Sequence, residues 1–267
     1  MTINSAIIAK NGIIVVTDSL LTARKENGET EYIAWKKSKI IFNEKLGFAI
    51  TYWGFAGNWE PKRKKFQFST FDFLNSLMDD CAEKKYSLSD TAKYFHEKWS
   101  IKNQILANPG IGMHLVGNEK VGNNYIPELY LLSNFTDPSY QNIGNFNITR
   151  ETYHTISKDE NFENHSSDEI RIQVLEYLKN NELLIFNNGD PIFFNIIANS
   201  IFNSIKYANS VNKLKPLNTL TELSKIPIST VEFISKLQNN FFRKGEQIVG
   251  GKVHAIGINE KGKILKL

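Results

Sequence analysis

The sequence contains almost no cysteine, since Cys81 is the only one among 267 residues. A single thiol cannot form an internal disulfide, and it excludes zinc sites built from several cysteines. No run of about 18 apolar residues occurs, and Met1-Thr2-Ile3-Asn4 shows no basic region leading into an apolar core. We therefore expect a soluble cytoplasmic protein with no secretory or membrane role.

The sequence also lacks a strong excess of one charge. Its 32 basic and 28 acidic residues give a formal charge of +4, and the basic side chains are scattered along the chain. A stripe of basic residues that could follow phosphates is missing, so nucleic acid is not an expected partner. The five histidines show no metal-binding spacing, so we expect neither a metal nor a cofactor.

One basic run does stand out, at Lys62-Arg63-Lys64-Lys65. Charged runs of this length are usually solvated, so we interpret it as an exposed approach to a helix. Contact with an acidic partner or a neighbouring subunit is the alternative.

The sequence is rich in apolar residues, at 41% hydrophobic and 12% aromatic, which is enough for a sizeable core. Before any helix we expect four strands: a hairpin over residues 3–18 that turns at Asn11-Gly12, then a pair at about 37–43 and 46–52. Capping serines at Ser69 and Ser87 then predict two consecutive helices.

The second half of the chain repeats this alternation. We expect strands at 113–116, 128–133 and 146–156, then a loop at 157–167 and an inserted helix around 172–178. An apolar run at 183–186 precedes two further helices. Asp190 caps the first of them before Pro191, and the second starts at Ser229 with Glu232 in a capping box. A hairpin over 253–267 ends the chain.

This order of elements predicts an α+β fold. Two antiparallel sheets can pack face to face while each helical pair covers one outer face. We therefore expect a four-layer αββα sandwich, as a single domain over residues 1–267, with an insertion at about 157–181.

Three segments carry a resemblance to a known family. Met1-Thr2 precedes the segment 10–18, which holds a glycine turn, an apolar strand and an aspartate. Lysines adjoin an apolar strand in 36–47, and a glycine pair, a strand and a glycine turn follow one another in 250–262. In their order and spacing, these segments resemble the proteasome-type family of N-terminal-nucleophile (Ntn) hydrolases, including bacterial proteasome-like peptidases, over nearly the whole chain.

The resemblance implies that Thr2 is the nucleophile once Met1 is removed. A threonine hydroxyl attacks poorly until a base takes its proton, and a free α-amino group has a pKa of about 7.7 to 8.0. Thr2 would supply both groups. Lys37 is then expected to be the electrostatic activator, with Asp18 as its partner. A shift of the register favours Lys39, which lies on the same strand face as Lys37.

The resemblance also indicates supporting residues. The stretch that contains Tyr52, Trp53 and Gly54 corresponds to the turn whose backbone N–H groups form an oxyanion hole, and Tyr52 and Trp53 are candidate substrate contacts. Glu246 stands where the family usually has an aspartate, and Val249 stands where it usually has a serine.

The expected function is hydrolysis of peptide or related amide bonds through an acyl-enzyme on Thr2. One alternative is a catalytically silent scaffold subunit of the same fold, and another is an enzyme that transfers the acyl group to an amine. A peptide or protein substrate and a homo-oligomer, as a ring or stacked rings, are the expected partners. The sequence identifies no regulatory ATPase.

Overall fold

The computed structural model describes residues 3–24, 30–33, 38–121, 124–156, 167–179, 183–189, 193–211, 213, 217–242 and 249–267. Within these ranges, 14 strands and six helices follow one another. The strands are β1 (Asn4–Ala9), β2 (Gly12–Thr17), β3 (Leu21–Arg24), β4 (Thr30–Ile33), β5 (Ile40–Asn43), β6 (Phe48–Gly54), β7 (Gly57–Glu60), β8 (Lys65–Ser69), β9 (Ile111–Val121), β10 (Asn124–Phe135), β11 (Ile143–Arg150), β12 (Leu184–Asn188), β13 (His254–Asn259) and β14 (Ile264–Lys266). The helices are α1 (Thr70–Lys84), α2 (Leu88–Ile105), α3 (Glu151–Ile156), α4 (Ser167–Lys179), α5 (Phe193–Ser210) and α6 (Leu220–Phe241).

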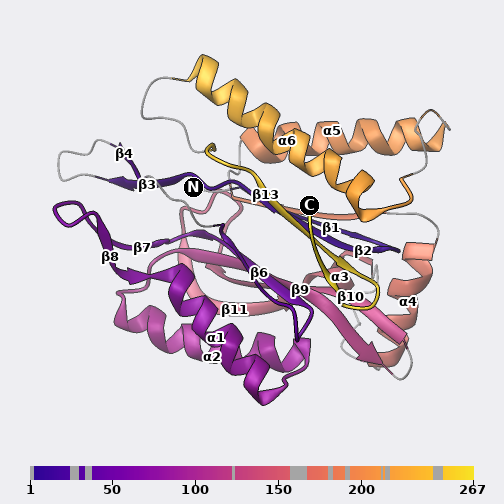
Figure 1. Cartoon of the computed structure of the whole chain (residues 1–267), viewed down its shortest axis with the longest axis horizontal. Coiled ribbons are helices and arrows are strands. Elements are labelled where there is room, and N and C mark those ends of the chain that lie inside the picture. The colour runs from indigo at the N-terminus through magenta and orange to yellow at the C-terminus, as the bar shows by residue number, and fades with distance from the viewer. Residues whose placement is uncertain are drawn as a thin grey trace.

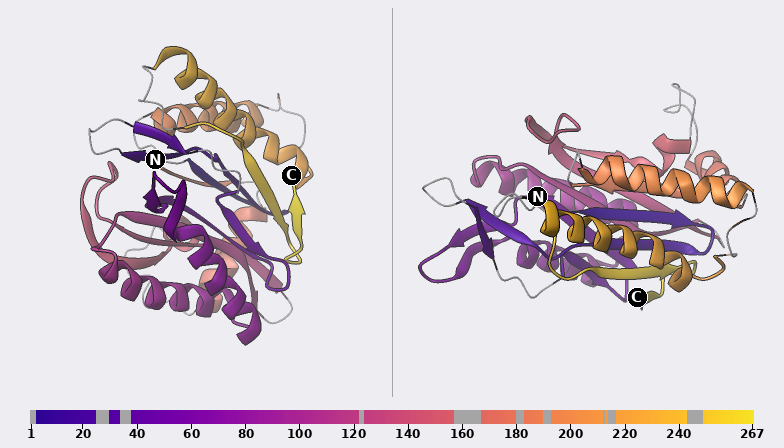
Figure 2. Two further views of the ribbon diagram at one scale, coloured as in Figure 1. Left: turned by 60° about the vertical axis from the view of Figure 1, so that its left-hand side comes forward. Right: turned by 90° about the horizontal axis from the view of Figure 1, so that it is seen from above.

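Ten of the strands form two antiparallel sheets of five strands each. One sheet has the order β12-β1-β2-β13-β14, and the other has the order β11-β10-β9-β6-β5. Helices α5 and α6 lie over the first sheet, whereas α1 and α2 lie over the second (Figures 1 and 2). The last two strands, β13 and β14, belong to the first sheet, where β13 pairs with β2.

Both faces of β1 and β2 are buried, in agreement with the apolar runs Ala6–Ala9 and Ile13–Val16. Successive side chains of a strand point to opposite faces. Ile7 and Ile14 pack against α5 and α6, while Ile8 and Ile13 pack between the sheets, against Ala49 and other side chains of the second sheet. A separate cluster holds α1 and α2 against the far face of the second sheet.

Local signals in the sequence located several elements correctly. The expected hairpin of β1 and β2 is present, but its turn residues are Lys10 and Asn11, because Gly12 already begins β2 and pairs with Ala9. Ser69 caps α1 by accepting a hydrogen bond from the N–H of Asp72, and Ser87 caps α2 through the N–H of Asp90. These elements are specified by short-range chemistry, which is why their starts could be read from the sequence.

The first part of the chain contains more strands than expected. Eight strands precede α1 in place of four, because β3–β4 and β7–β8 form two additional hairpins. Both project at the same end of the sheets (Figure 1). The expected strand at 146–156 is also wrong, because β11 ends at Arg150 and residues 151–156 form the short helix α3.

Helix α6 begins nine residues before the expected start at Ser229. Its N-cap is Thr219, which forms a complete capping box with Glu222. Pro227 lies inside the helix, and a proline there usually breaks a helix because it lacks an N–H group. The buried side chains on either side of Pro227 hold the helix against the sheet, so tertiary packing overrides this local signal. Asp190 and Pro191 lie outside the described residues. None of the described helices is long and apolar enough to cross a membrane.

Candidate active site

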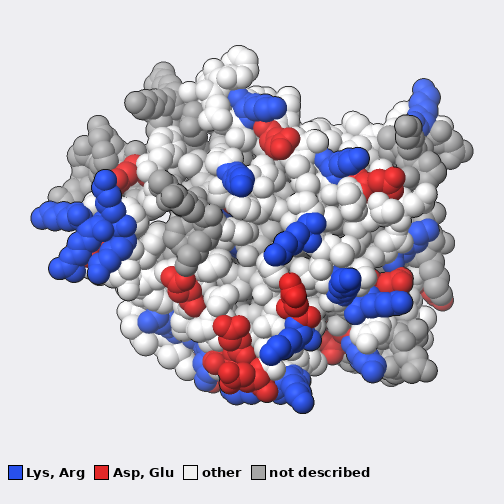
Figure 3. Space-filling view, viewed as in Figure 1, with Lys and Arg blue, Asp and Glu red and all other residues white. Residues whose placement is uncertain are grey.

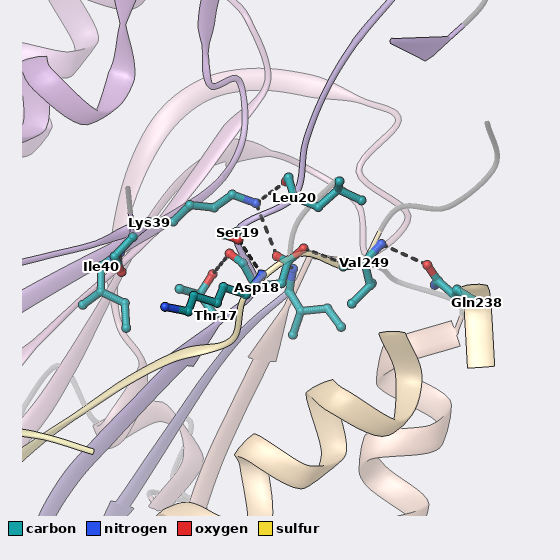
Figure 4. Close-up of polar contacts among 12 residues, drawn as sticks. Thr17, Asp18, Ser19, Leu20, Lys39, Ile40, Gln238 and Val249 are labelled. Atoms are coloured by element: carbon teal, nitrogen blue, oxygen red, sulfur yellow. Dashed lines mark hydrogen bonds and ion pairs between the residues drawn. The ribbon is translucent and has the colours of Figure 1, made fainter. Parts of the chain in front are cut away.

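Asp18 lies directly after β2, is fully buried, and joins three segments of the chain (Figure 4). Its Oδ1 accepts hydrogen bonds from the backbone N–H of Ile3 at 3.1 Å and from Lys39 Nζ at 3.3 Å. Its Oδ2 accepts the N–H of Gly250 at 3.1 Å. The carboxylate therefore fixes the start of β1, the start of β5 and the segment before β13 at one point.

Lys39 provides the positive charge at this point. Its side chain is fully buried, and Nζ also donates to the carbonyl oxygen of Leu20. Burial lowers the pKa of Lys39, while the charge of Asp18 and its hydrogen bond oppose that change. A lowered pKa increases the share of neutral amine, which is the form that can accept a proton.

The glycine pair at 250–251 lies against the turn that follows β2. Leu20 N–H donates to the carbonyl of Gly250 at 3.0 Å, and Lys252 N–H donates to Ser19 Oγ at 2.7 Å. Gly251 has a φ of +75°, and a Cβ atom there would lie 2.6 Å from Ser19 Oγ. Only glycine allows the two backbones to come this close.

Gln238 is a supporting residue that sequence reasoning missed. It is fully buried, and its Oε1 accepts the N–H of Val249 at 2.9 Å. Phe241 near the end of α6 is 80% exposed, and the buried side of the helix continues from Ile234 to Gln238. Gln238 follows Ile234 by four residues, which places both on one face of a helix. This spacing was the signal that could have revealed the buried Gln238.

A pocket adjoins the Asp18–Lys39 pair. Its volume is about 520 Å³, and it begins at Leu20, whose carbonyl binds Lys39. Ile33 of β4, Gly54 at the end of β6, and Trp59 and Phe66 of the β7–β8 hairpin contribute to its walls. The two hairpins that the sequence did not predict therefore shape the space beside the buried ion pair.

The described part of the chain contains only some of the expected catalytic residues. Asp18 pairs with Lys39, which was the alternative register. Thr2, Lys37 and Glu246 lie outside the described residues.

The three residues expected at the oxyanion turn do not all face the pocket. Gly54 lines the pocket, whereas Tyr52 and Trp53 are each only 2% exposed and are not part of its lining. Tyr52 packs in the cluster under α1 and α2, and Trp53 points to the opposite face, toward His114. A direct substrate contact by either side chain is therefore wrong, because consecutive strand residues enter opposite buried faces.

A buried polar network lies between the sheets. Tyr140 donates from its hydroxyl to Asn188 Oδ1, and the other end of that amide contacts His114 Nε2 at 2.7 Å. Burial lowers the pKa of His114 to about 3, so the ring is neutral near pH 7. Within the described residues, no group of His, Cys, Asp and Glu side chains could hold a metal ion.

The sheets and their helices have a proteasome-like fold. This is shown by comparison with solved structures, among them a mutant of the protein Anbu from Hyphomicrobium sp. strain MC1. The match has a TM-score of 0.54 and covers 100% of this chain and 85% of that chain, at 11% sequence identity. At this identity, the likeness concerns the fold alone.

The family resemblance read from the sequence has to be corrected. No family model matches the chain, and no curated protein matches it. Short glycine turns, apolar strands and single lysines recur in many proteins, so three such segments do not establish membership of the proteasome-type family. What stands is the likeness of fold.

Proposed function

We propose that this chain, a four-layer αββα sandwich forming one domain, is an N-terminal threonine hydrolase that cleaves peptide or related amide bonds. Thr2 acts once the residue before it has been removed. The observation that carries the proposal is the hydrogen bond from Ile3 N–H to Asp18, whose carboxylate also binds Lys39. Ile3 directly follows Thr2 in the chain, so this hydrogen bond ties the residue next to the proposed nucleophile to the ion pair.

The chemistry requires three groups. The Thr2 hydroxyl oxygen bonds to the amide carbon of the substrate, and the free α-amino group of Thr2 takes the hydroxyl proton and passes it to the leaving amine. Water then hydrolyses the resulting ester. Lys39, in place of Lys37, favours deprotonation of these groups through its charge, and Asp18 holds it in position.

The test is covalent labelling by a β-lactone or an epoxyketone, followed by mass spectrometry of the N-terminal peptide. We expect labelling on Thr2, its loss in Thr2→Ala, and partial retention in Thr2→Ser. Lys39→Ala should abolish labelling, whereas the matched variant Lys37→Ala should retain most of it.

Other outcomes would count against this proposal. Labelling that persists in Thr2→Ala, or that appears on Cys81, rejects Thr2 as the nucleophile. A folded protein that retains Met1 and is not labelled favours the silent scaffold. Stronger loss in Lys37→Ala than in Lys39→Ala assigns the activating role to Lys37.

We also propose that the chain forms a homo-oligomer through the outer face of α5 and α6. Ile196 and Tyr207 of α5 are 64% and 69% exposed, and Phe233 and Phe241 of α6 are 51% and 80% exposed. We take these exposed apolar side chains, all on the two helices that cover the first sheet, as the proposed contact. Light scattering should give a mass above 30.6 kDa, and Ile196→Asp with Phe233→Asp should reduce it to the monomer mass.

A further inference from the structure

The β7–β8 hairpin has a basic tip. Lys62, Arg63 and Lys64 lie in its turn, Lys65 begins β8, and all four side chains are exposed. Figure 3 shows basic side chains gathered at the end of the molecule where this hairpin projects in Figure 1. The structure thus corrects the expectation that this run leads into a helix, because α1 begins only at Thr70.

Most of this positive charge is not neutralised. Arg63 contacts Glu60 at 3.3 Å, but Lys62, Lys64 and Lys65 form no ion pair with any described residue. Four like charges in four consecutive residues repel one another at an exposed turn. A bound acidic group would relieve that repulsion.

The same hairpin forms a wall of the pocket beside the ion pair. Trp59 and Phe66 are opposite one another in the ladder, with ring centroids 5.1 Å apart, and both line the pocket. Lys65 directly precedes Phe66 in the chain. The hairpin therefore joins an aromatic pocket wall to a cationic tip within one rigid element.

We propose that this hairpin binds an acidic segment of the substrate, so that the enzyme selects peptides with an apolar residue next to a cluster of Asp or Glu. The proposal rests on the proposed function, because it takes the pocket as the place where the substrate lies. The apolar side chain enters the pocket, and the acidic residues lie along the tip. A strand extends about 3.3 Å per residue, so the acidic cluster falls two to four residues from the apolar one.

Peptide binding is the way to test this separately from catalysis. The Thr2→Ala variant of the full chain would be titrated into fluorescein-labelled peptides, with fluorescence anisotropy as the readout. Three peptides share a central phenylalanine: one has three glutamates before it, one has three after it, and one has glutamines in those places. At low salt, we expect one acidic peptide to bind about tenfold more tightly than the glutamine peptide, with the advantage decreasing as salt is added.

Two matched variants identify the surface responsible. The first changes Lys62, Arg63, Lys64 and Lys65 to glutamine. The second changes four exposed lysines of the β5–β6 and β13–β14 hairpins, Lys45, Lys261, Lys263 and Lys266, in the same way, so both lose the same charge. The acidic preference should disappear in the first variant and persist in the second.

Three results would overturn the proposal. The glutamine peptide could bind as tightly as the acidic ones, the preference could survive in the hairpin variant, or a single-stranded oligonucleotide could displace the acidic peptide because it binds more tightly. Each is independent of covalent labelling at Thr2, which tests the proposed function by itself. A protein that is labelled at Thr2 but shows no acidic preference retains the proposed function and loses this inference.

Discussion

Two buried carboxylates of this protein pair with a basic side chain, and they are supported in different ways. Asp18 receives two backbone N–H groups in addition to Lys39, from Ile3 and Gly250. Glu128 of β10 is 2% exposed and is held by Arg150 through both of its oxygens. If Lys39 were removed, the Asp18 carboxylate would still accept two backbone N–H groups. The Glu128 carboxylate accepts no hydrogen bond other than those from Arg150 within the described residues.

The chemistry of the two basic side chains also differs. The planar guanidinium of Arg150 fits a carboxylate with two parallel hydrogen bonds, and it ties β11 to β10. Lys39 presents a single amine, which burial shifts toward the neutral form. In the proposed reaction Lys39 acts through its charge, and the two backbone N–H groups keep the Asp18 carboxylate in place beside it.

The largest loss of stability should follow Arg150→Met. This change leaves the Glu128 carboxylate buried without a cation, which typically costs about 3 to 5 kcal/mol. Urea unfolding would measure the loss. The double variant Glu128→Met with Arg150→Met should recover most of it, and a loss below about 1 kcal/mol would show that this pair contributes little.

A smaller loss, confined to acid, should come from His114, a buried base with no opposing charge. Its folded pKa of about 3 lies below the value of about 6.5 in the unfolded chain, so the unfolded state binds more protons between these values. Its contribution to stability is complete above pH 6.5 and falls with pH, by on the order of 3 kcal/mol near pH 4.

The matched variant is His114→Gln, whose carbonyl oxygen can still accept a hydrogen bond from Asn188. Unfolding measured from pH 7 to pH 4 should show a weaker acid dependence in this variant than in the parent. Identical curves would mean that His114 becomes protonated in the folded protein.

The smallest change in stability should follow Lys39→Met. This change also leaves a buried carboxylate without its cation, but Asp18 keeps the N–H groups of Ile3 and Gly250, so the loss in the free energy of unfolding should be smaller than that of Arg150→Met. Labelling at Thr2 should nevertheless fall strongly. A loss as large as that of Arg150→Met would make the Asp18–Lys39 pair structural and weaken its proposed catalytic role.

The predictable parts of the fold were those with short-range causes. The turn signal at Asn11-Gly12, one residue away from the observed turn, and the serine caps act over two or three residues, and they located β1, β2, α1 and α2. The hairpins β3–β4 and β7–β8 were missed because their strands are only four or five residues long, and the one clear alternation of apolar residues, Phe66 and Phe68 in β8, was not recognised. The start of α6 was misplaced because Ser229 and Glu232 were interpreted as a capping box, whereas the helix is capped by Thr219 with Glu222.

The candidate site was predictable only in part, for a related reason. Asp18 could be found because it ends an apolar strand at a recognisable distance from Asn11-Gly12. Whether Lys37 or Lys39 reaches Asp18 depends on the chain between β3 and β5, and no local rule fixes its course. Gln238 contacts Val249 only after α6 has packed on the sheet, so its role follows from tertiary structure.

The hydrogen bond between Asp18 and Gly250 has a consequence for the timing of synthesis. It joins residues 232 positions apart, so the carboxylate cannot be fully satisfied until nearly the whole chain has left the ribosome. The Asp18–Lys39 pair, on which the proposed activity depends, is therefore completed only when the segment before β13 has been synthesised.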